Sequence, residues 1–150
     1  MTEPAVTEDA TPGRAPRFHL AMPVDDLAAA RRFYGEVLGC RPGRSAETWA
    51  DWNLGGHQFV THLAGQRTAQ IHNPVDGHDV PVPHFGLILD IPAFHTLADR
   101  LRAAGTRFVI EPYVRFEGEP GEQWTMFLLD PAGNALEFKA FADDAQIFAT

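Results

Sequence analysis

The chain has 150 residues, of which 45% are hydrophobic and 21% charged, a composition typical of one globular domain. It carries 12 Lys and Arg against 20 Asp and Glu, and this net charge of −8 argues against a general surface for nucleic acid or anionic membranes. The single cysteine, Cys40, excludes an intrachain disulfide and fits a reducing compartment. No apolar run approaches membrane-spanning length and the N-terminus lacks an apolar signal core, so we expect a cytoplasmic protein.

The predicted elements begin with a tail and a first series of strands and a helix. Residues 1–16 are rich in Pro, Thr and acidic residues, which predicts a flexible tail. The spacing of apolar residues then predicts a strand, a helix, and two strands that meet at Gly55-Gly56. These elements cover residues 17–24, residues 25–40, "TWADWNLGG" and "HQFVTHLAG".

A second series repeats the order of the first. Residues 65–83 separate the two series, and their abundance of Pro, Gly, Asn and Asp predicts a long loop. When His19 is placed on His84, Asp25 falls on Asp90, so the two series correspond residue by residue at their start. The second series predicts a strand, a helix and three strands, at 84–91, 92–105, 106–112, 122–130 and 134–141.

This internal repeat predicts an α+β fold in one domain, residues 17–150. Two βαβββ modules, at about 17–64 and about 84–141, would pair into a curved mixed sheet that forms a cup. The competing interpretation is coincidence, since alternation of strands and helices is common in proteins.

Four metal-competent side chains lie at matching places in the two modules. His19 and His84 each open a first strand, and His62 and Glu137 each lie on a last strand. A single strand histidine is more often structural, and most strand glutamates are solvated, but four at repeated positions are harder to explain by packing. Two imidazoles and one carboxylate form the facial triad that suits Fe(II). With His62 added, the set would equally suit Zn(II), Ni(II), Co(II) or Mn(II).

Three stretches make the sequence similar to the vicinal oxygen chelate superfamily, which contains glyoxalase I, extradiol ring-cleaving dioxygenases and bleomycin-resistance proteins. They are "FHLAMPVDDLAAARRFYGEVLGC", "VPHFGLILD" and "FLLDPAGNALEFKAF", within a resemblance that covers about residues 17–141. The loop "HNPVDGHDVPVPHFG" and the stretch "FEGEPGEQWTMFLLDPAGNALEFKAF" most resemble small single-domain proteins described as predicted extradiol-type dioxygenases.

The resemblance implies that His19, His84 and Glu137 coordinate a divalent metal ion, with Fe(II) favoured. The fourth glyoxalase position, usually a carboxylate, falls near His62, and ring-cleaving dioxygenases place an acid-base histidine in the same neighbourhood. His62 is therefore a candidate catalytic residue or a fourth ligand. In one departure from the pattern, Phe127 stands where those dioxygenases commonly hold a tyrosine, about ten residues before the glutamate ligand.

Four further residues are candidates for lining a substrate pocket. One of the two tryptophans of "TWADWNLGG" is expected in the cleft, and Trp52 is the candidate. Arg115 borders the loop "FEGEPG", which is either a plain surface loop or a loop that folds over the pocket. Tyr113 and Trp124, together with Gln123, are candidates to take the place of the missing tyrosine.

Three functions follow from the resemblance. The favoured one is a ring-cleaving, extradiol-type dioxygenase, in which His62 moves protons. The second is a glyoxalase-like, metal-dependent lyase or isomerase, although no basic cluster for glutathione carboxylates is evident along the chain. The third is a resistance-type protein that binds a small molecule without metal. In each case the partner is a small molecule, with no nucleic acid or membrane, and we expect a homodimer.

Overall fold

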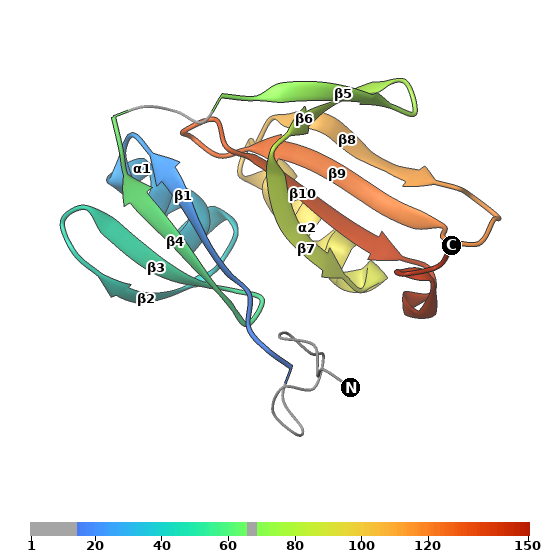
Figure 1. Ribbon diagram of the computed structural model, residues 1–150, viewed down its shortest axis with the longest axis horizontal. Coiled ribbons are helices and arrows are strands. Elements are labelled where there is room, and N and C mark those ends of the chain that lie inside the picture. Colours follow the sequence, from blue (N-terminus) through green and yellow to red (C-terminus); the bar gives the residue numbers. More distant parts are fainter. Residues whose placement is uncertain (1–14, 66–68) are drawn as a thin grey trace, which may run out of the picture.

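The computed structural model describes residues 15–65 and 69–150, so nearly all of the predicted tail at 1–16 lies outside the described residues. The strands form two four-stranded sheets and one two-stranded sheet (Figure 1). None of the helices in the described ranges has the length and apolar character needed to span a bilayer.

Module one contains the first sheet, in the order β1-β4-β3-β2 (sheet 1). β1 runs parallel to β4, and the other pairs are antiparallel. The Asp26 side chain accepts a hydrogen bond from the Ala29 N–H and so begins the helix, and Gly39, with φ 75°, follows its end. The elements are β1 (His19–Val24), α1 (Leu27–Arg31), the π-helical turn η1 (Arg32–Val37), β2 (Arg41–Ser45), β3 (Trp49–Leu54) and β4 (His57–Leu63).

Module two repeats this arrangement in the order β7-β10-β9-β8 (sheet 2). β7 runs parallel to β10, as β1 does to β4, and the Asp90 side chain caps α2 as Asp26 caps α1. The predicted α+β fold with two βαβββ modules is confirmed. The elements are β7 (His84–Leu89), α2 (Ile91–Ala103), β8 (Phe108–Arg115), β9 (Gln123–Leu129), β10 (Ala135–Phe141) and the short 3₁₀ turn η2 (Asp144–Gln146).

Two segments differ from the sequence prediction. The strand β2, "RPGRS", has no apolar pattern because all its residues are exposed, and its bulged pairing with β3 accommodates the Pro and Gly. The predicted loop at 65–83 is wrong over most of its length, since it contains the hairpin β5 (Ile71–Val75) and β6 (His78–Val82). The turn of this hairpin is Asp76-Gly77, with φ of 51° and 75°, the positive values that two-residue hairpin turns require.

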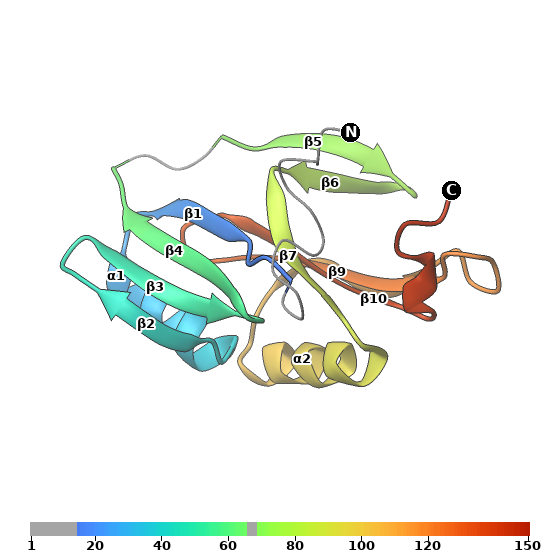
Figure 2. The same ribbon diagram turned by 60° about the horizontal axis from the view of Figure 1, so that its bottom comes forward.

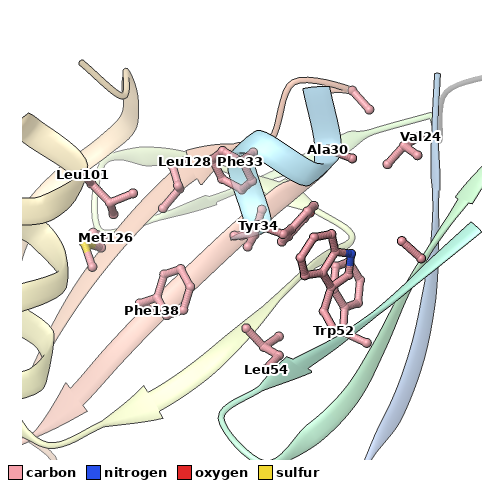
Figure 3. Packing of buried hydrophobic residues seen from close by; sticks show 14 of the residues in the cluster. Val24, Ala30, Phe33, Tyr34, Trp52, Leu54, Leu101, Met126, Leu128 and Phe138 are labelled. Carbon is pink, nitrogen blue, oxygen red and sulfur yellow. The ribbon is translucent and has the colours of Figure 1, made fainter. Parts of the chain in front are cut away.

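One hydrophobic core is shared by the two modules. Figure 3 shows Phe33 and Tyr34 of η1 between the strands of module one and those of module two. Burial of a large apolar side chain stabilises a fold by about 1.5–3 kcal/mol. The core therefore stabilises the packing of helix on sheet within each module and the packing of one module on the other. Its largest members include Tyr34, Trp52, Phe59, Phe94, Leu101, Met126, Leu128 and Phe138.

A buried polar network joins the modules within this core. Asp130, only 4% exposed, follows β9 and accepts a hydrogen bond from the Tyr34 hydroxyl at 2.7 Å. It also accepts bonds from the backbone N–H and side-chain amide of Asn134, and that amide donates to the Pro23 carbonyl of β1. Burial, and then the Asp130 carboxylate, raise the pKa of Tyr34 well above its usual value, so the hydroxyl remains a donor.

The core determines which face of each sheet is left outside. Leu20 and Met22 of β1, and Leu136 and Phe138 of β10, point into the core. Alternation along a strand therefore directs their neighbours to the opposite face of each sheet, which we call the outer face. Figure 1 shows α1 behind the strands of sheet 1 and α2 behind the strands of sheet 2.

The β5–β6 hairpin covers part of the outer face of sheet 2. Val80 of β6 packs with Ile110 and Phe127, and Val75 and Tyr113 pack against this small cluster. Figure 2 shows the hairpin on one side of sheet 2 and α2 on the other. The hairpin thus forms a wall beside the part of the outer face that β7 and β10 supply.

Candidate metal centre

His84 and Glu137 lie together on the outer face of sheet 2. His84 Nε2 is 3.0 Å from Glu137 Oε2. His84 Nδ1 is 2.7 Å from the Pro81 carbonyl oxygen, which can only accept, so Nδ1 carries a proton. Nε2, the nitrogen that faces Glu137, then either carries a second proton or has a free lone pair. A free lone pair beside a carboxylate oxygen is an arrangement that a bound cation would stabilise.

The surroundings of Glu137 favour its charged form. Burial opposes ionisation, but the hydrogen bond with His84, the charge of Lys139 and the Thr125 hydroxyl outweigh it and lower the pKa of Glu137. Thr125 Oγ1 donates to Glu137 Oε1 at 2.8 Å, and Lys139 Nζ is 3.7 Å from the same oxygen. The hydrogen bond with Glu137 likewise raises the pKa of His84, against the effect of burial. One carboxylate oxygen is thus held by the protein, and the other faces the imidazole.

Gly86 allows β7 to approach Glu137 closely. It pairs with Glu137 in the parallel register of β7 and β10. A Cβ atom at position 86 would lie 1.6 Å from the Glu137 carbonyl oxygen, and backbone on both sides leaves no flexible atom to move. The glycine in "HFGLIL" is therefore required by the position of the glutamate.

His19 lies on the outer face of sheet 1 with a similar support. Its Nδ1 is 2.9 Å from Gln58 Oε1, and Gln58 Nε2 is 3.4 Å from Asp51 Oδ2. Because the Asp51 carboxylate accepts, the Gln58 amide turns its nitrogen toward Asp51 and its oxygen toward His19. The proton of His19 is then on Nδ1, which leaves Nε2 free as a ligand, as in metal sites where the second nitrogen donates to a neighbour.

The structure brings together two of the three predicted ligands. Within residues 15–65 and 69–150, no cluster of three His, Cys, Asp or Glu side chains could hold a metal ion. His19 lies on the outer face of sheet 1 beside Gln58, whereas His84 and Glu137 lie together on the outer face of sheet 2. Within the single chain, His84 and Glu137 therefore form a pair that does not include His19.

The expected equivalence of His62 and Glu137 is wrong by two residues. His19 pairs with Gln58, and His84 pairs with Ala135. Counting from these partners, Val60 is the equivalent of Glu137, and His62 is the equivalent of Lys139. His62 is exposed, on the same face as Gln58 and four residues further along β4, which is about 13 Å in a strand.

The candidate pocket residues divide between the two faces of the sheets. Tyr113 and Arg115 pair with Thr125 and Gln123, so they lie on the outer face of sheet 2, and Arg115 forms an ion pair with Asp76 of the hairpin turn. Burial, and then the Asp76 carboxylate, raise the pKa of Tyr113.

The prediction that Trp52 and Trp124 line the pocket is wrong. Trp52 is 4% exposed in the shared core, where its indole N–H donates to Thr61 Oγ1. Trp124 packs against Phe94 and His95 of α2, on the helix side of sheet 2. Both rings are large apolar groups on core-facing positions, and a sequence pattern does not distinguish a core tryptophan from a cleft tryptophan.

Phe127 lies at the predicted place of the missing tyrosine. It pairs directly with Glu137 across β9 and β10, and its ring meets the His84 ring edge-on, with centroids 5.0 Å apart. It provides an apolar wall beside His84 and Glu137 and offers no hydroxyl.

Comparison with known proteins agrees with this fold. A sequence model of the Glyoxalase/Bleomycin resistance protein/Dioxygenase superfamily matches residues 18–138. The chain belongs to this superfamily. Members of the superfamily are mostly enzymes, bind small molecules and commonly use divalent metal ions. No curated protein matches the sequence.

Solved structures of the superfamily resemble the chain over nearly its full length. A glyoxalase/bleomycin resistance protein/dioxygenase from Alicyclobacillus acidocaldarius is 32% identical, with a TM-score of 0.75 over 93% of this chain and 99% of that one. A lactoylglutathione lyase from Agrobacterium tumefaciens is 20% identical, with a TM-score of 0.62 over 87% and 96%. A fosfomycin resistance protein from Listeria monocytogenes is 14% identical, with a TM-score of 0.65 over 85% and 93%. The last two support the fold alone.

The residues that hold Glu137 and His19 in place were not predicted from the sequence. Thr125 reaches Glu137 from β9, and Gln58 reaches His19 from β4. Neither contact has a local signal, because both cross between strands that are distant in the sequence. Lys139 carries a signal, since alternation along β10 puts it on the same face as Glu137.

Proposed function

We propose that this superfamily member is a metal-dependent enzyme acting on a substrate that chelates the ion through vicinal oxygens, with ring-cleaving dioxygenation by Fe(II) as the favoured reaction. The observation that carries the proposal is the donor set. His84 and His19 each have Nδ1 occupied by an acceptor, and Glu137 is held ionised beside His84. Two histidines and one carboxylate suit Fe(II) and leave positions for substrate and oxygen.

The register of β4 favours three protein ligands. Glyoxalase-type sites usually supply a carboxylate as the fourth ligand, but here the equivalent of Glu137 in module one is Val60. An aliphatic side chain cannot coordinate a metal, so more of the coordination sphere is left for substrate. The Val60 position therefore supports a dioxygenase reaction over a lyase reaction.

The site needs a second copy of the chain to be complete. His19 lies on β1 and His84 on β7, and each is the first strand in the order of its sheet, at an edge. In a two-fold dimer with β1 of one copy beside β7 of the other, both copies donate the same residues and two equal sites form. Ile88, on the outer face of β7 and 48% exposed, would be covered in such a contact.

In the proposed site, three residues of the chain hold the ion and others fix the orientation of those three side chains. His19, His84 and Glu137 would hold the ion, which, when bound, supplies Lewis-acid activation of the chelated oxygens and electron transfer to oxygen. The Pro81 carbonyl and the Gln58 amide fix the two rings, and Thr125 fixes the carboxylate. The hairpin β5–β6 and Phe127 limit water on one side of the site.

His62 has the same relation to Val60 that Lys139 has to Glu137. Lys139 lies 3.7 Å from the ligand oxygen without being in the coordinating position, and His62 lies two residues, about 7 Å, beyond Val60 on the same face. This relation favours a group that receives or returns a substrate proton over a fourth ligand.

The reaction is tested on protein purified without chelator or added metal. We expect about one iron per chain and oxygen uptake with one or more members of a catechol panel, with a ring-opened product identified by mass spectrometry. Bound metal with no oxygen uptake on any catechol would overturn the dioxygenase assignment and leave the lyase reading.

Mixing two inactive variants tests whether the site lies between copies. His19→Ala and Glu137→Ala each damage both sites of a homodimer. Mixed after dissociation, they should form heterodimers with one intact site and recover about a quarter of the wild-type activity, since half the dimers are mixed and each has half its sites. No recovery, with heterodimers demonstrated by native mass spectrometry, would contradict a site shared between copies.

A further inference from the structure

An open hollow on the outer face of sheet 1 gathers the positive charge of three distant segments. Its volume is about 380 Å³, and its wall includes Arg17, Arg41 and Arg44. The chain as a whole has a net charge of −8, so three arginines around one hollow run against its overall charge. The basic cluster that is not evident along the sequence is assembled by the fold.

The arginines have little to neutralise them. Asp51 is the acidic residue in the wall, and its distance to Arg44 is 4.0 Å, at the limit for an ion pair, with the Arg44 side chain 84% exposed. Arg17 and Arg41 have no hydrogen-bond or ion-pair partner among residues 15–65 and 69–150. Guanidinium groups without partners are well suited to bind planar anions through two parallel hydrogen bonds.

The hollow is continuous with the support of His19. Gln58 lines it and holds His19 on one side and Asp51 on the other. Arg17 lies two residues before His19, so an extended chain directs both side chains to the same face. Arg41 pairs with Asn53, which is also on that face.

Gly43 keeps space in the hollow. A Cβ atom there would lie 3.1 Å from the Cβ of Asp51, so a larger residue would crowd the floor between the arginines. Asn53 and Gln58 add amide groups to the wall. The hollow is thus polar and positively charged, with room for a small ligand group.

We infer that this hollow binds a carboxylate group of the substrate, with Arg41 and Arg44 as the principal partners. The inference rests on the proposed function for one point only, that the other end of the same molecule reaches the ion held by His19. It assigns the substrate to the class of anionic vicinal-oxygen compounds. Binding of the carboxylate itself requires neither metal nor turnover.

Binding is tested on metal-free protein with benzoate and with benzamide, which has the same shape and no charge. In nuclear magnetic resonance spectra, benzoate should shift the guanidinium Nε–H signals of Arg41 and Arg44 in a saturable way, and benzamide should bind about tenfold more weakly or worse. The double variant Arg41→Gln/Arg44→Gln should lose about tenfold or more in benzoate affinity. Arg31→Gln, an exposed arginine of α1, is the matched control and should bind benzoate as the wild type does.

Two results would overturn the inference: equal binding of benzoate and benzamide, or equal benzoate affinity in the wild type and the double variant. Either leaves the metal proposal intact, because no metal is present in the experiment. Once turnover is established, 3,4-dihydroxybenzoate and catechol extend the test. The double variant should raise KM about tenfold for the carboxylate and leave catechol unchanged, and an equal change for both would also overturn the inference.

Discussion

Glu137→Ala is expected to lose the metal and all measurable turnover. The carboxylate is held ionised by His84, Lys139 and Thr125, so its removal deletes a charged ligand that the protein has oriented. Loss of a supporting residue typically costs 10–100-fold in metal affinity, and loss of a ligand should cost more. Metal content after dialysis and oxygen uptake measure the two effects.

Thermal unfolding is an independent measure of metal binding by Glu137→Ala. An ion that binds only the folded state stabilises it, by about 2.7 kcal/mol when its concentration is a hundred times Kd. Chelator should therefore lower the Tm of the wild type and leave the Tm of Glu137→Ala nearly unchanged. Glu111→Ala, at an exposed position of β8, should respond as the wild type does. Equal chelator sensitivity in wild type and Glu137→Ala would make Glu137 an ordinary solvated strand residue.

His62→Ala provides the contrast within the same site. If His62 moves a proton, the variant keeps its metal and its chelator response, and turnover falls by roughly a hundred- to ten-thousand-fold. Metal lost together with activity would instead make His62 a ligand. Full metal with full activity would assign it to the scaffold.

Asp130→Ala is expected to have the largest effect on stability. The substitution removes an acceptor of three hydrogen bonds and leaves the fully buried Tyr34 hydroxyl without its partner. Loss of one member of a buried charged network costs about 3–5 kcal/mol. For a domain of this length that corresponds to a fall in Tm of about 6–20 °C, measured by calorimetry or circular dichroism.

Two further variants define the Asp130 result. Tyr34→Phe removes one hydrogen bond to a charged group, so it should cost about 1.5–3 kcal/mol, less than Asp130→Ala. Asp99→Ala removes a carboxylate that is 81% exposed and should change stability by about 0.5 kcal/mol or less. An Asp130→Ala protein as stable as Asp99→Ala would mean that the network does not join the modules energetically.

Local chemistry was sufficient to predict most of the fold. The spacing of apolar residues, the turn at Gly55-Gly56 and the repeat at His19 and His84 predicted the two modules, because the signals of strand, helix and turn act over a few residues. The strand β2 was not predicted because an exposed edge strand needs no apolar residues. The β5–β6 hairpin was not predicted because the Pro, Gly, Asn and Asp content of residues 65–83 is typical of a loop, although Asp76-Gly77 is itself a hairpin signal.

For the site, the sequence by itself determined which side chains are competent to bind a metal and which strands carry them. Only the tertiary structure decided which of them meet: His84 meets Glu137 on sheet 2, and His19 meets Gln58 on sheet 1. It also showed that His62 is the equivalent of Lys139 and not of Glu137, and that Trp52 and Trp124 lie on core-facing sides. The physical reason is that a strand pattern specifies two faces but not the register with a neighbour, nor which face packs against the other module. Register and packing come from hydrogen bonds and apolar contacts between residues far apart in the chain.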